Sequence, residues 1–285
     1  MSHKTIEKRR PQAVVISDLH LGTVGCKAES LHAYLKTIRP EILVLNGDII
    51  DAWRFSRNYF PASHMKVVRQ IIKMMESDTR VIYIAGNHDE VLRRFTDINF
   101  EGFSVVNKVV LTLDSQKTWI FHGDVFDVVM HHSKWLAHLG SVGYGLLTVI
   151  NKTVNALLGL FGKRRISLAK KIKDKVKGGA GKEVTKFEKT VADLAIGKGY
   201  RYAICGHIHR PAHKIVKSDK GMVTYLNSGD WVESMTALEY ENGNWHLKFW
   251  DQEQTAAIEE PAIEELFSKP AGDIFRKVFH EVIRS

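Results

Sequence analysis

Side chains that could hold metal ions recur just after short apolar runs in this chain. They are Asp18, His20, Asp48, Asn87, His88, His122, His207 and His209. Imidazole, carboxylate and amide oxygen suit divalent ions such as manganese, iron or zinc, and the absence of cysteine among these donors argues against a closed structural zinc site. One ion could not use all these donors, but two could. Two ions roughly 3.5–4 Å apart need a bridging carboxylate, and Asp48 is the candidate because it follows the central run.

The spacing within these groups also indicates a shared target. In an extended strand, residues i and i+2 point the same way. Asp18 can therefore face one point with His20, and His207 with His209. Glycines adjoin the donors and permit tight turns and close backbone approach. They are Gly47, Gly86, Gly123 and Gly206.

Taken singly, each donor has an ordinary structural explanation. Asp18 could cap a helix, Asp48 could belong to an Asx turn, and the histidines could be half-buried side chains. Five groups nevertheless share one arrangement, in which an apolar run leads directly into donors. This repetition favours the joint metal site over separate structural roles.

The apolar runs predict the elements that position the donors. Five runs are typical of strands buried on both faces, at 13–17, 42–46, 81–85, 118–121 and 202–205. Helical spacing near 27–38 and 62–77 alternates with the first three, which indicates βαβ units. Four later segments predict antiparallel hairpins, at 213–217, 222–227, 235–240 and 245–250. We therefore expect an α/β fold of two sheets with helices outside.

Residues 131–198 break this pattern. Apolar residues recur there at helical spacing, and polar residues such as Asn151 and Lys152 argue against a membrane span. We expect a helical insertion in a domain of residues 1–253, followed by a helical tail at 254–285. Residues 163–189 hold eleven Lys and Arg against three Asp and Glu. They could form a solvated helix face or a surface for acidic lipid.

Composition narrows the class of protein. The 285 residues are 44% hydrophobic and 26% charged, as in soluble globular proteins, and the net charge of +9 favours an anionic partner. Two cysteines, Cys26 and Cys205, do not form a disulfide framework and fit a reducing compartment. The charged start, MSHKTIEKRR, lacks a signal-peptide core. We expect a cytoplasmic protein, with peripheral contact to an anionic inner membrane as an open alternative.

The donor motifs together resemble the calcineurin-like metallophosphoesterase superfamily. They are DLH (18–20), GDIID (47–51), GNHD (86–89), HGD (122–124) and GHIH (206–209). The resemblance implies a four-layer αββα sandwich and two metal ions, with manganese expected and iron or zinc as alternatives. It implies one ion held by Asp18, His20, Asp48 and His209. It implies a second ion held by Asp48, Asn87, His122 and His207.

The same resemblance implies a hydrolytic reaction. Two cations would neutralise a phosphoryl group and give hydroxide from a shared water near neutral pH. His88 matches the residue that usually acts as acid or transition-state stabiliser in the superfamily, and Asp89 matches the residue that orients its ring. An imidazole titrates near neutral pH, so proton donation by His88 is chemically reasonable.

Within the superfamily, the chain is most similar to bacterial UDP-2,3-diacylglucosamine pyrophosphohydrolases of lipid A synthesis. GDIIDAW (47–53) resembles their GD-x-x-E-A-W stretch, GHIHRP (206–211) resembles their GH-T-H-R-P, and the insertion takes the place of their acyl-binding cap. The resemblance implies cleavage of a nucleotide-linked glycolipid to UMP and lipid X. His88 is a departure, because well-known members carry arginine there, which clamps phosphate and cannot donate a proton.

Further side chains beside the motifs are candidates for binding substrate. They are Arg54, Arg210 and Trp53, with Arg93 and Arg94 as weaker candidates that surface solubility explains equally well. Another phosphodiesterase, phosphatase or nuclease activity stays an alternative. The sequence does not show the interleaved aromatic and basic residues that are typical of binding single-stranded nucleic acid. A non-catalytic scaffold of the same fold is disfavoured, because every expected metal ligand is present.

Overall fold

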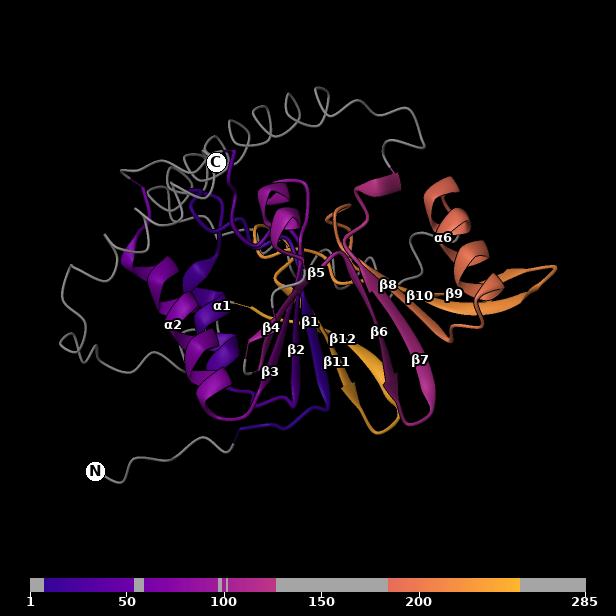
Figure 1. Ribbon diagram of the computed structural model, residues 1–285, viewed down its shortest axis with the longest axis horizontal. Coiled ribbons are helices and arrows are strands. Elements are labelled where there is room, and N and C mark those ends of the chain that lie inside the picture. Colours follow the sequence, from indigo (N-terminus) through magenta and orange to yellow (C-terminus); the bar gives the residue numbers. More distant parts are fainter. Residues whose placement is uncertain (1–7, 54–58, 97–98, 101, 127–183, 252–285) are drawn as a thin grey trace, which may run out of the picture.

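The structure is a computed structural model that describes residues 8–53, 59–96, 99–100, 102–126 and 184–251. Two β-sheets lie face to face in it, with helices on the outer face of each (Figure 1). The described part of the chain is therefore an α/β sandwich of four layers, as predicted.

The first sheet contains the strands that precede Asp18, Asp48 and Asn87. Its strands β1, β2, β3 and β5 run parallel, and β11, β12 and β4 pair antiparallel at its two sides. Across the sheet the order is β12 (Asn244–Phe249), β11 (Thr236–Glu241), β1 (Ala13–Ile16), β2 (Ile42–Asn46), β3 (Arg80–Ile84), β5 (Phe103–Val106) and β4 (Asn99–Phe100).

The second sheet contains the strands that precede His122 and His207. Strands β7, β8 and β10 run parallel, whereas β6 and β9 are antiparallel to their neighbours. The order is β6 (Lys108–Leu113), β7 (Gln116–Phe121), β8 (Tyr202–Cys205), β10 (Gly221–Asn227) and β9 (Ala212–Ser218).

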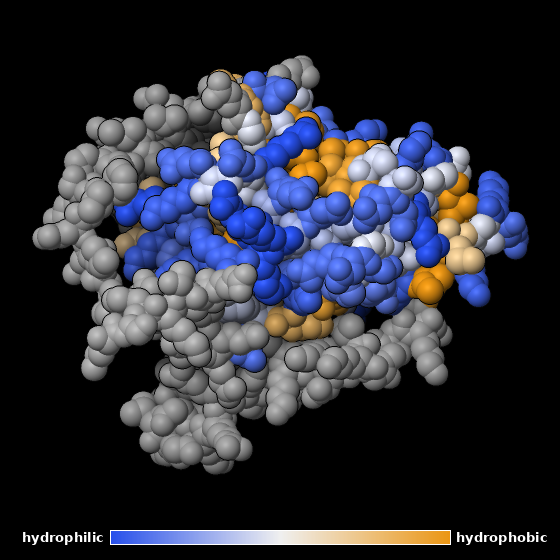
Figure 2. Space-filling view, turned by 90° about the horizontal axis from the view of Figure 1, so that it is seen from below, coloured by the Kyte–Doolittle hydropathy of each residue, from blue (hydrophilic) through white to orange (hydrophobic). Residues whose placement is uncertain are grey.

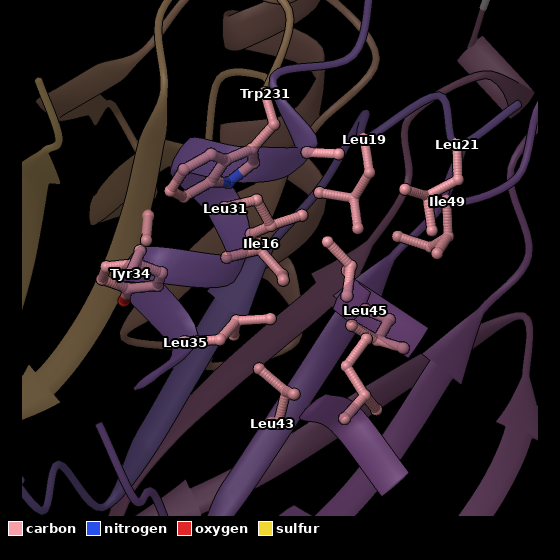
Figure 3. Close-up of a cluster of buried hydrophobic side chains, with 14 of the residues drawn as sticks. Ile16, Leu19, Leu21, Leu31, Tyr34, Leu35, Leu43, Leu45, Ile49 and Trp231 are labelled. Carbon is pink, nitrogen blue, oxygen red and sulfur yellow. The ribbon is translucent and has the colours of Figure 1, made fainter. Parts of the chain in front are cut away.

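Three hydrophobic cores separate the four layers. The strands are buried on both faces, so alternate residues serve different cores: Val14 and Ile16 of β1 pack with the helical layer, and Ala13 and Val15 pack between the sheets. The outer layer on the first sheet consists of α1 (Ala28–Lys36) and α2 (Ala62–Glu76). Figure 3 shows Leu31 and Leu35 of α1 directed at strands β1 and β2. Burial of each such leucine side chain stabilises the fold by roughly 1.5–3 kcal/mol relative to an exposed one.

The outer layer on the second sheet is α6 (Lys186–Gly197), which packs against β8, β9 and β10. The helix begins with a capping box, in which the Thr185 hydroxyl accepts from Glu188 N and the Glu188 carboxylate accepts from Thr185 N. Glu188 also accepts from Lys214 Nζ of β9 at 2.8 Å. The apolar face of α6 forms the third core with the second sheet.

The structure confirms the five predicted strands, both predicted helices and both predicted hairpins. Strands β4, β5 and β6 were not predicted. The edge strand β6 alternates between buried and exposed residues, and β4 is only two residues long. Of the predicted insertion at 131–198, residues 131–183 lie outside the described part, and the remainder contributes α6 to the sandwich. The predicted tail at 254–285 also lies outside the described residues.

The surface at the lower end of the sandwich is mainly hydrophilic, with separate hydrophobic patches among the described residues (Figure 2). In the described part of the chain, no helix combines the length and apolarity needed to cross a membrane.

Candidate metal centre and active site

The predicted donors gather at one end of the sandwich, in the loops that follow the parallel strands. Backbone bonds continue past the strand ends and hold these loops together: Asp18 N donates to Gly47 O at 3.0 Å, and His20 N donates to Asp48 O at 2.9 Å. Gly206 N donates to His122 O at 2.9 Å on the second sheet. The loops of the two sheets also meet, because His207 N donates to Asp18 Oδ2 at 3.1 Å.

Asp18, His20 and His209 form a first cluster of donors, whose ligand atoms lie within 4.8 Å of one another. His209 Nε2 lies 3.1 Å from Asp18 Oδ1 and 3.4 Å from His20 Nε2. The first two residues come from the loop after β1 and the third from the loop after β8. The first cluster is therefore shared by both sheets.

Asp48, His122 and His207 form a second cluster by the same measure. His122 Nε2 lies 3.3 Å from Asp48 Oδ2 and 3.3 Å from the amide oxygen of Asn87. Asp48 also belongs to a group with His20 and His88. Its position next to both clusters is the one expected of a bridging carboxylate.

The donors fit a pair of divalent ions. Ligand atoms bound at roughly 2.1 Å to one ion stand roughly 3–3.5 Å apart, and the spacings of 3.1 to 3.4 Å between donors agree with this. Asp18 is fully buried, and its Oδ1 accepts no aligned hydrogen bond from the described residues, although His209 is close. A buried carboxylate oxygen without a donor is costly unless a cation compensates it.

The donors reach this arrangement through left-handed backbone rather than through extended strands. The φ angles are positive at Asp18 (53°), His20 (50°), Asp48 (54°), His207 (63°) and His209 (52°). The predicted convergence of Asp18 and His20 on one point is confirmed, whereas His207 and His209 lie in different clusters. The extended backbone assumed for both pairs is wrong, since β1 ends at Ile16 and β8 at Cys205. Left-handed backbone costs roughly 1–2 kcal/mol per residue, and such strain gathers at functional sites.

Glycines allow the backbone to approach the donors closely, as predicted. A Cβ atom at Gly86 would lie 2.2 Å from Asp48 Oδ1, and one at Gly47 would lie 2.2 Å from His122 Nδ1. A Cβ atom at Gly206 would lie 2.6 Å from Asp18 Oδ2. Any larger residue at these positions would displace a donor.

Charge in the clusters is set by burial and by the facing groups. Burial opposes ionisation of Asp18 and Asp48, but neighbouring imidazoles, His209 for Asp18 and His122 for Asp48, lower the pKa of each carboxyl overall. Burial likewise opposes protonation of His209, but Asp18 raises its pKa to about 9. Anionic oxygens thus face ring nitrogens that take up protons. Divalent ions would replace those protons, because imidazole binds metal in its neutral form.

His88 is buried beside the clusters. Its Nε2 lies 4.0 Å from Asp48 Oδ2, and its Nδ1 lies 3.1 Å from Asp51 Oδ1. Burial disfavours its charged form, but Asp51 and Asp48 raise the pKa of His88 overall. The ring also contacts Trp53, with ring centroids 4.3 Å apart. His88 therefore has one nitrogen toward Asp51 and the other toward the donors.

Asp89 does not orient the ring of His88. Its carboxylate accepts from Gly86 N at 2.6 Å, from Ile49 N at 2.8 Å and from the Tyr83 hydroxyl at 2.5 Å. These bonds fix the turn that carries Asn87 and tie it to the loop after β2. The prediction that Asp89 orients this ring is wrong, because its two carboxylate oxygens accept from these three other groups instead.

Asp51 is the carboxylate beside the ring, and the sequence prediction did not select it. It lies 3.1 Å from His88 Nδ1 and 3.4 Å from His20 Nδ1, and both imidazoles lower the pKa of Asp51 against the effect of burial. The signal in the sequence was the second aspartate of GDIID (47–51).

The sequence prediction also did not select two oxygen groups that lie beside the histidine ligands. Asn46 O lies 2.9 Å from His122 Nδ1, which leaves Nε2 for the second cluster. Asp230 Oδ2 lies 4.0 Å from His209 Nδ1. Asp230 follows β10 in a GD pair, the same pairing as Gly47 with Asp48, and this repetition was the signal for it.

The candidate substrate-binding residues differ in their exposure and contacts. Trp53 is half-buried against His88, and Arg210 is exposed directly after His209. Arg54 lies outside the described residues. Arg94 is exposed, whereas the guanidinium of Arg93 binds Asp124 and Ala85 O.

Metal donors from both sheets meet at one end of this fold. A sequence model of a protein family, described as Calcineurin-like phosphoesterase, matches residues 12–211, and the chain belongs to this family. It is a metal-dependent phosphoester hydrolase.

The chain is similar over most of its length to two bacterial proteins. The chain is 26% identical over 250 residues to a UDP-2,3-diacylglucosamine hydrolase of Aliivibrio fischeri (strain MJ11), a match that covers 81% of this chain and 95% of the relative. It is 24% identical over 244 residues to the protein of that name from Pseudomonas aeruginosa (strain UCBPP-PA14), covering 82% and 97%. A solved structure described as a novel archaeal phosphodiesterase aligns with a TM-score of 0.40 and 14% identity, covering 83% and 98%.

Proposed function

We propose that this protein hydrolyses the pyrophosphate of UDP-2,3-diacylglucosamine and releases UMP and lipid X. The observation that carries the proposal is the pair of donor clusters around Asp48, with His88 directly beside them. The relatives named for this substrate match over 95% and 97% of their own lengths, which supports the choice of substrate.

The first ion would be held by Asp18, His20, Asp48 and His209. The second would be held by Asp48, Asn87, His122 and His207. When bound, such ions supply positive charge to phosphate oxygens and acidity to a coordinated water. Manganese is the proposed ion, with iron and zinc as alternatives that the donor set also suits.

His88 is proposed to protonate or hydrogen-bond the leaving oxygen through Nε2. Asp51 faces Nδ1 and holds the ring in place, and its negative charge stabilises the protonated imidazole, so that Nε2 carries a proton to donate. Trp53 covers the ring of His88 and limits its rotation. The arrangement resembles other catalytic imidazoles, where a carboxylate fixes one ring nitrogen while the other meets the substrate.

The positive charge of Arg210 is proposed to contact substrate phosphate. Its place next to His209 brings the backbone within one residue of the first cluster, and its side chain is exposed. Arg54 stays a proposed phosphate contact. The basic residues at 163–189 are proposed to approach anionic lipid, so that the protein can reach an acylated substrate.

The test is a comparison of substrates with purified protein and Mn²⁺. Hydrolysis of UDP-2,3-diacylglucosamine with kcat/KM at least ~100-fold above that for bis(p-nitrophenyl) phosphate is expected, because remote binding energy favours the true substrate. Turnover of the small diester without turnover of the glycolipid would reject this substrate while keeping the phosphoesterase. Cleavage of single-stranded DNA at a comparable rate would favour a nuclease instead.

A second candidate is a phosphodiesterase or phosphatase with another substrate. The observation that favours it is His88, which occupies the position where the resembling lipid A enzymes carry arginine. Imidazole can supply a proton that guanidinium cannot. The same panel, extended to other nucleotide diphosphate esters, separates the two candidates.

A further inference from the structure

Arg93 links the loops that carry two donors of the second cluster. It lies in the short 3₁₀ helix η1 (Glu90–Phe95), which directly follows the GNHD turn. Its Nη2 donates to Asp124 Oδ2 at 2.6 Å and to Ala85 O at 3.3 Å. One nitrogen of one side chain thus contacts the loop after β3 in the first sheet and the loop after β7 in the second.

Both contacts lie close to proposed metal ligands. Ala85 stands two residues before Asn87, and Asp124 stands two residues after His122. Asn87 Oδ1 and His122 Nε2 are 3.3 Å apart, although they come from different sheets. The separation of these two ligands therefore depends on how the two loops are held together.

We propose that Arg93 and Asp124 form a clasp that sets the spacing of Asn87 and His122 for the second metal ion. Arg93 is then a positioning residue, and the inference rests on the proposed metal centre. The ion pair is partly buried, with side-chain exposures of 32% for Arg93 and 14% for Asp124. A pair so placed keeps more of its attraction than a fully exposed one.

Charge supports the clasp over a direct contact between Arg93 and phosphate. A lone guanidinium beside two divalent ions would be repelled by them, whereas the carboxylate of Asp124 neutralises it locally. A substrate phosphate that bound Arg93 would have to displace Asp124, whose Oδ2 lies 2.6 Å from Arg93 Nη2. The carboxylate of Asp124 would then be left without a compensating charge. The expectation that Arg93 binds phosphate is thus replaced by a role within the protein.

The chemistry of the contact defines the variants. Arg93 Nε is buried without a hydrogen-bond partner among the described residues, so Nη2 carries the contacts with both loops. Arg93→Met removes both the charge and the donor, while Arg93→Lys keeps a positively charged donor group without the guanidinium. Asp124→Asn removes the charge of the acceptor. Arg80→Met is the matched control, because Arg80 is exposed at the opposite end of β3.

The test measures binding of Mn²⁺ to the metal-free full chain by titration calorimetry, with electron paramagnetic resonance to detect coupled ion pairs. The wild type and Arg80→Met are expected to bind two ions. Arg93→Met and Asp124→Asn are expected to weaken one of the two binding steps by roughly 10- to 100-fold, as loss of a ligand-orienting contact does. The other step should stay within about twofold, and Arg93→Lys should recover part of the loss.

A double variant separates a clasp from two independent effects. If Arg93 and Asp124 act as a pair, Arg93→Met with Asp124→Asn should weaken the affected step no more than the larger single change. The Tm of the metal-free variants should stay within about 4 °C of the wild type, because ion pairs of this kind add little to stability.

Three outcomes would overturn the clasp. Unchanged affinity for both ions in Arg93→Met, with two ions bound by the wild type, would reject it and leave the metal centre intact. Equal weakening of both steps with a large fall in Tm would show a general folding defect. Failure of the wild type to bind a pair of ions would reject the dinuclear centre and the clasp together.

Discussion

His122 of the second donor cluster and His209 of the first differ in how firmly the protein holds them. In the second cluster, the side chain of His122 is 1% exposed and its Nδ1 lies 2.9 Å from a backbone carbonyl, Asn46 O. In the first cluster, the side chain of His209 is 27% exposed, and Asp230 lies 4.0 Å from its Nδ1. A buried ligand fixed by the backbone keeps its orientation before metal arrives. The second cluster is therefore expected to retain its ion more firmly than the first.

The largest expected effect comes from removing Asp48, the carboxylate proposed to bridge the two clusters. Asp48→Asn should lower kcat/KM for bis(p-nitrophenyl) phosphate on the order of 1000-fold, because both clusters lose a charged donor. Metal analysis should show fewer than two ions per chain. Asp78→Asn, whose side chain is 98% exposed, is the control and should match the wild type. Retention of two ions with normal activity would show that Asp48 does not bridge the clusters.

A smaller effect is expected beside the clusters. His88→Ala should lower kcat by at least ~100-fold and leave both ions bound, since His88 is proposed to act on the leaving group. His88→Arg keeps the positive charge but cannot donate a proton. Activity close to wild type in His88→Arg would show that charge, and not proton transfer, is what position 88 supplies. A kcat that barely changes in His88→Ala would make the residue a bystander.

The contrast between the clusters can be tested directly by graded removal of metal. Chelator added in steps to the Mn²⁺-loaded protein should release one ion at roughly tenfold lower chelator concentration than the other. In His209→Gln the weaker step should disappear, while in His122→Gln the tighter step should disappear. Simultaneous release of both ions at every chelator concentration would contradict a difference between the clusters.

The smallest effect is expected at the rim of the first cluster. Arg210→Met should raise KM for UDP-2,3-diacylglucosamine by roughly 3- to 10-fold and leave kcat within about twofold, because an exposed cation contributes modestly to binding of phosphate. The diester bis(p-nitrophenyl) phosphate serves as the internal comparison. A fall in kcat with unchanged KM would place Arg210 in the reaction rather than in binding.

Much of the fold was predictable because its parallel strands are local signals. A strand buried on both faces gives a continuous apolar run, and five such runs were enough to predict the central strands of both sheets. The antiparallel β6 gave no such run, since its residues alternate between exposed and buried. Helix α6 was hidden inside a longer helical pattern, and only its packing against β8, β9 and β10 assigns it to the sandwich.

The donors at the strand ends could be predicted from the sequence, because ligand type and strand end are both local properties. The partners of those donors could not be predicted in this way. His88 lies beside Asp51 and not beside its neighbour Asp89, because the carboxylate of Asp89 accepts from its own turn, from Ile49 N and from Tyr83. Arg93 meets Asp124 from the other sheet. Such pairings depend on how loops from two sheets cross, and that crossing is set by sheet packing rather than by sequence spacing.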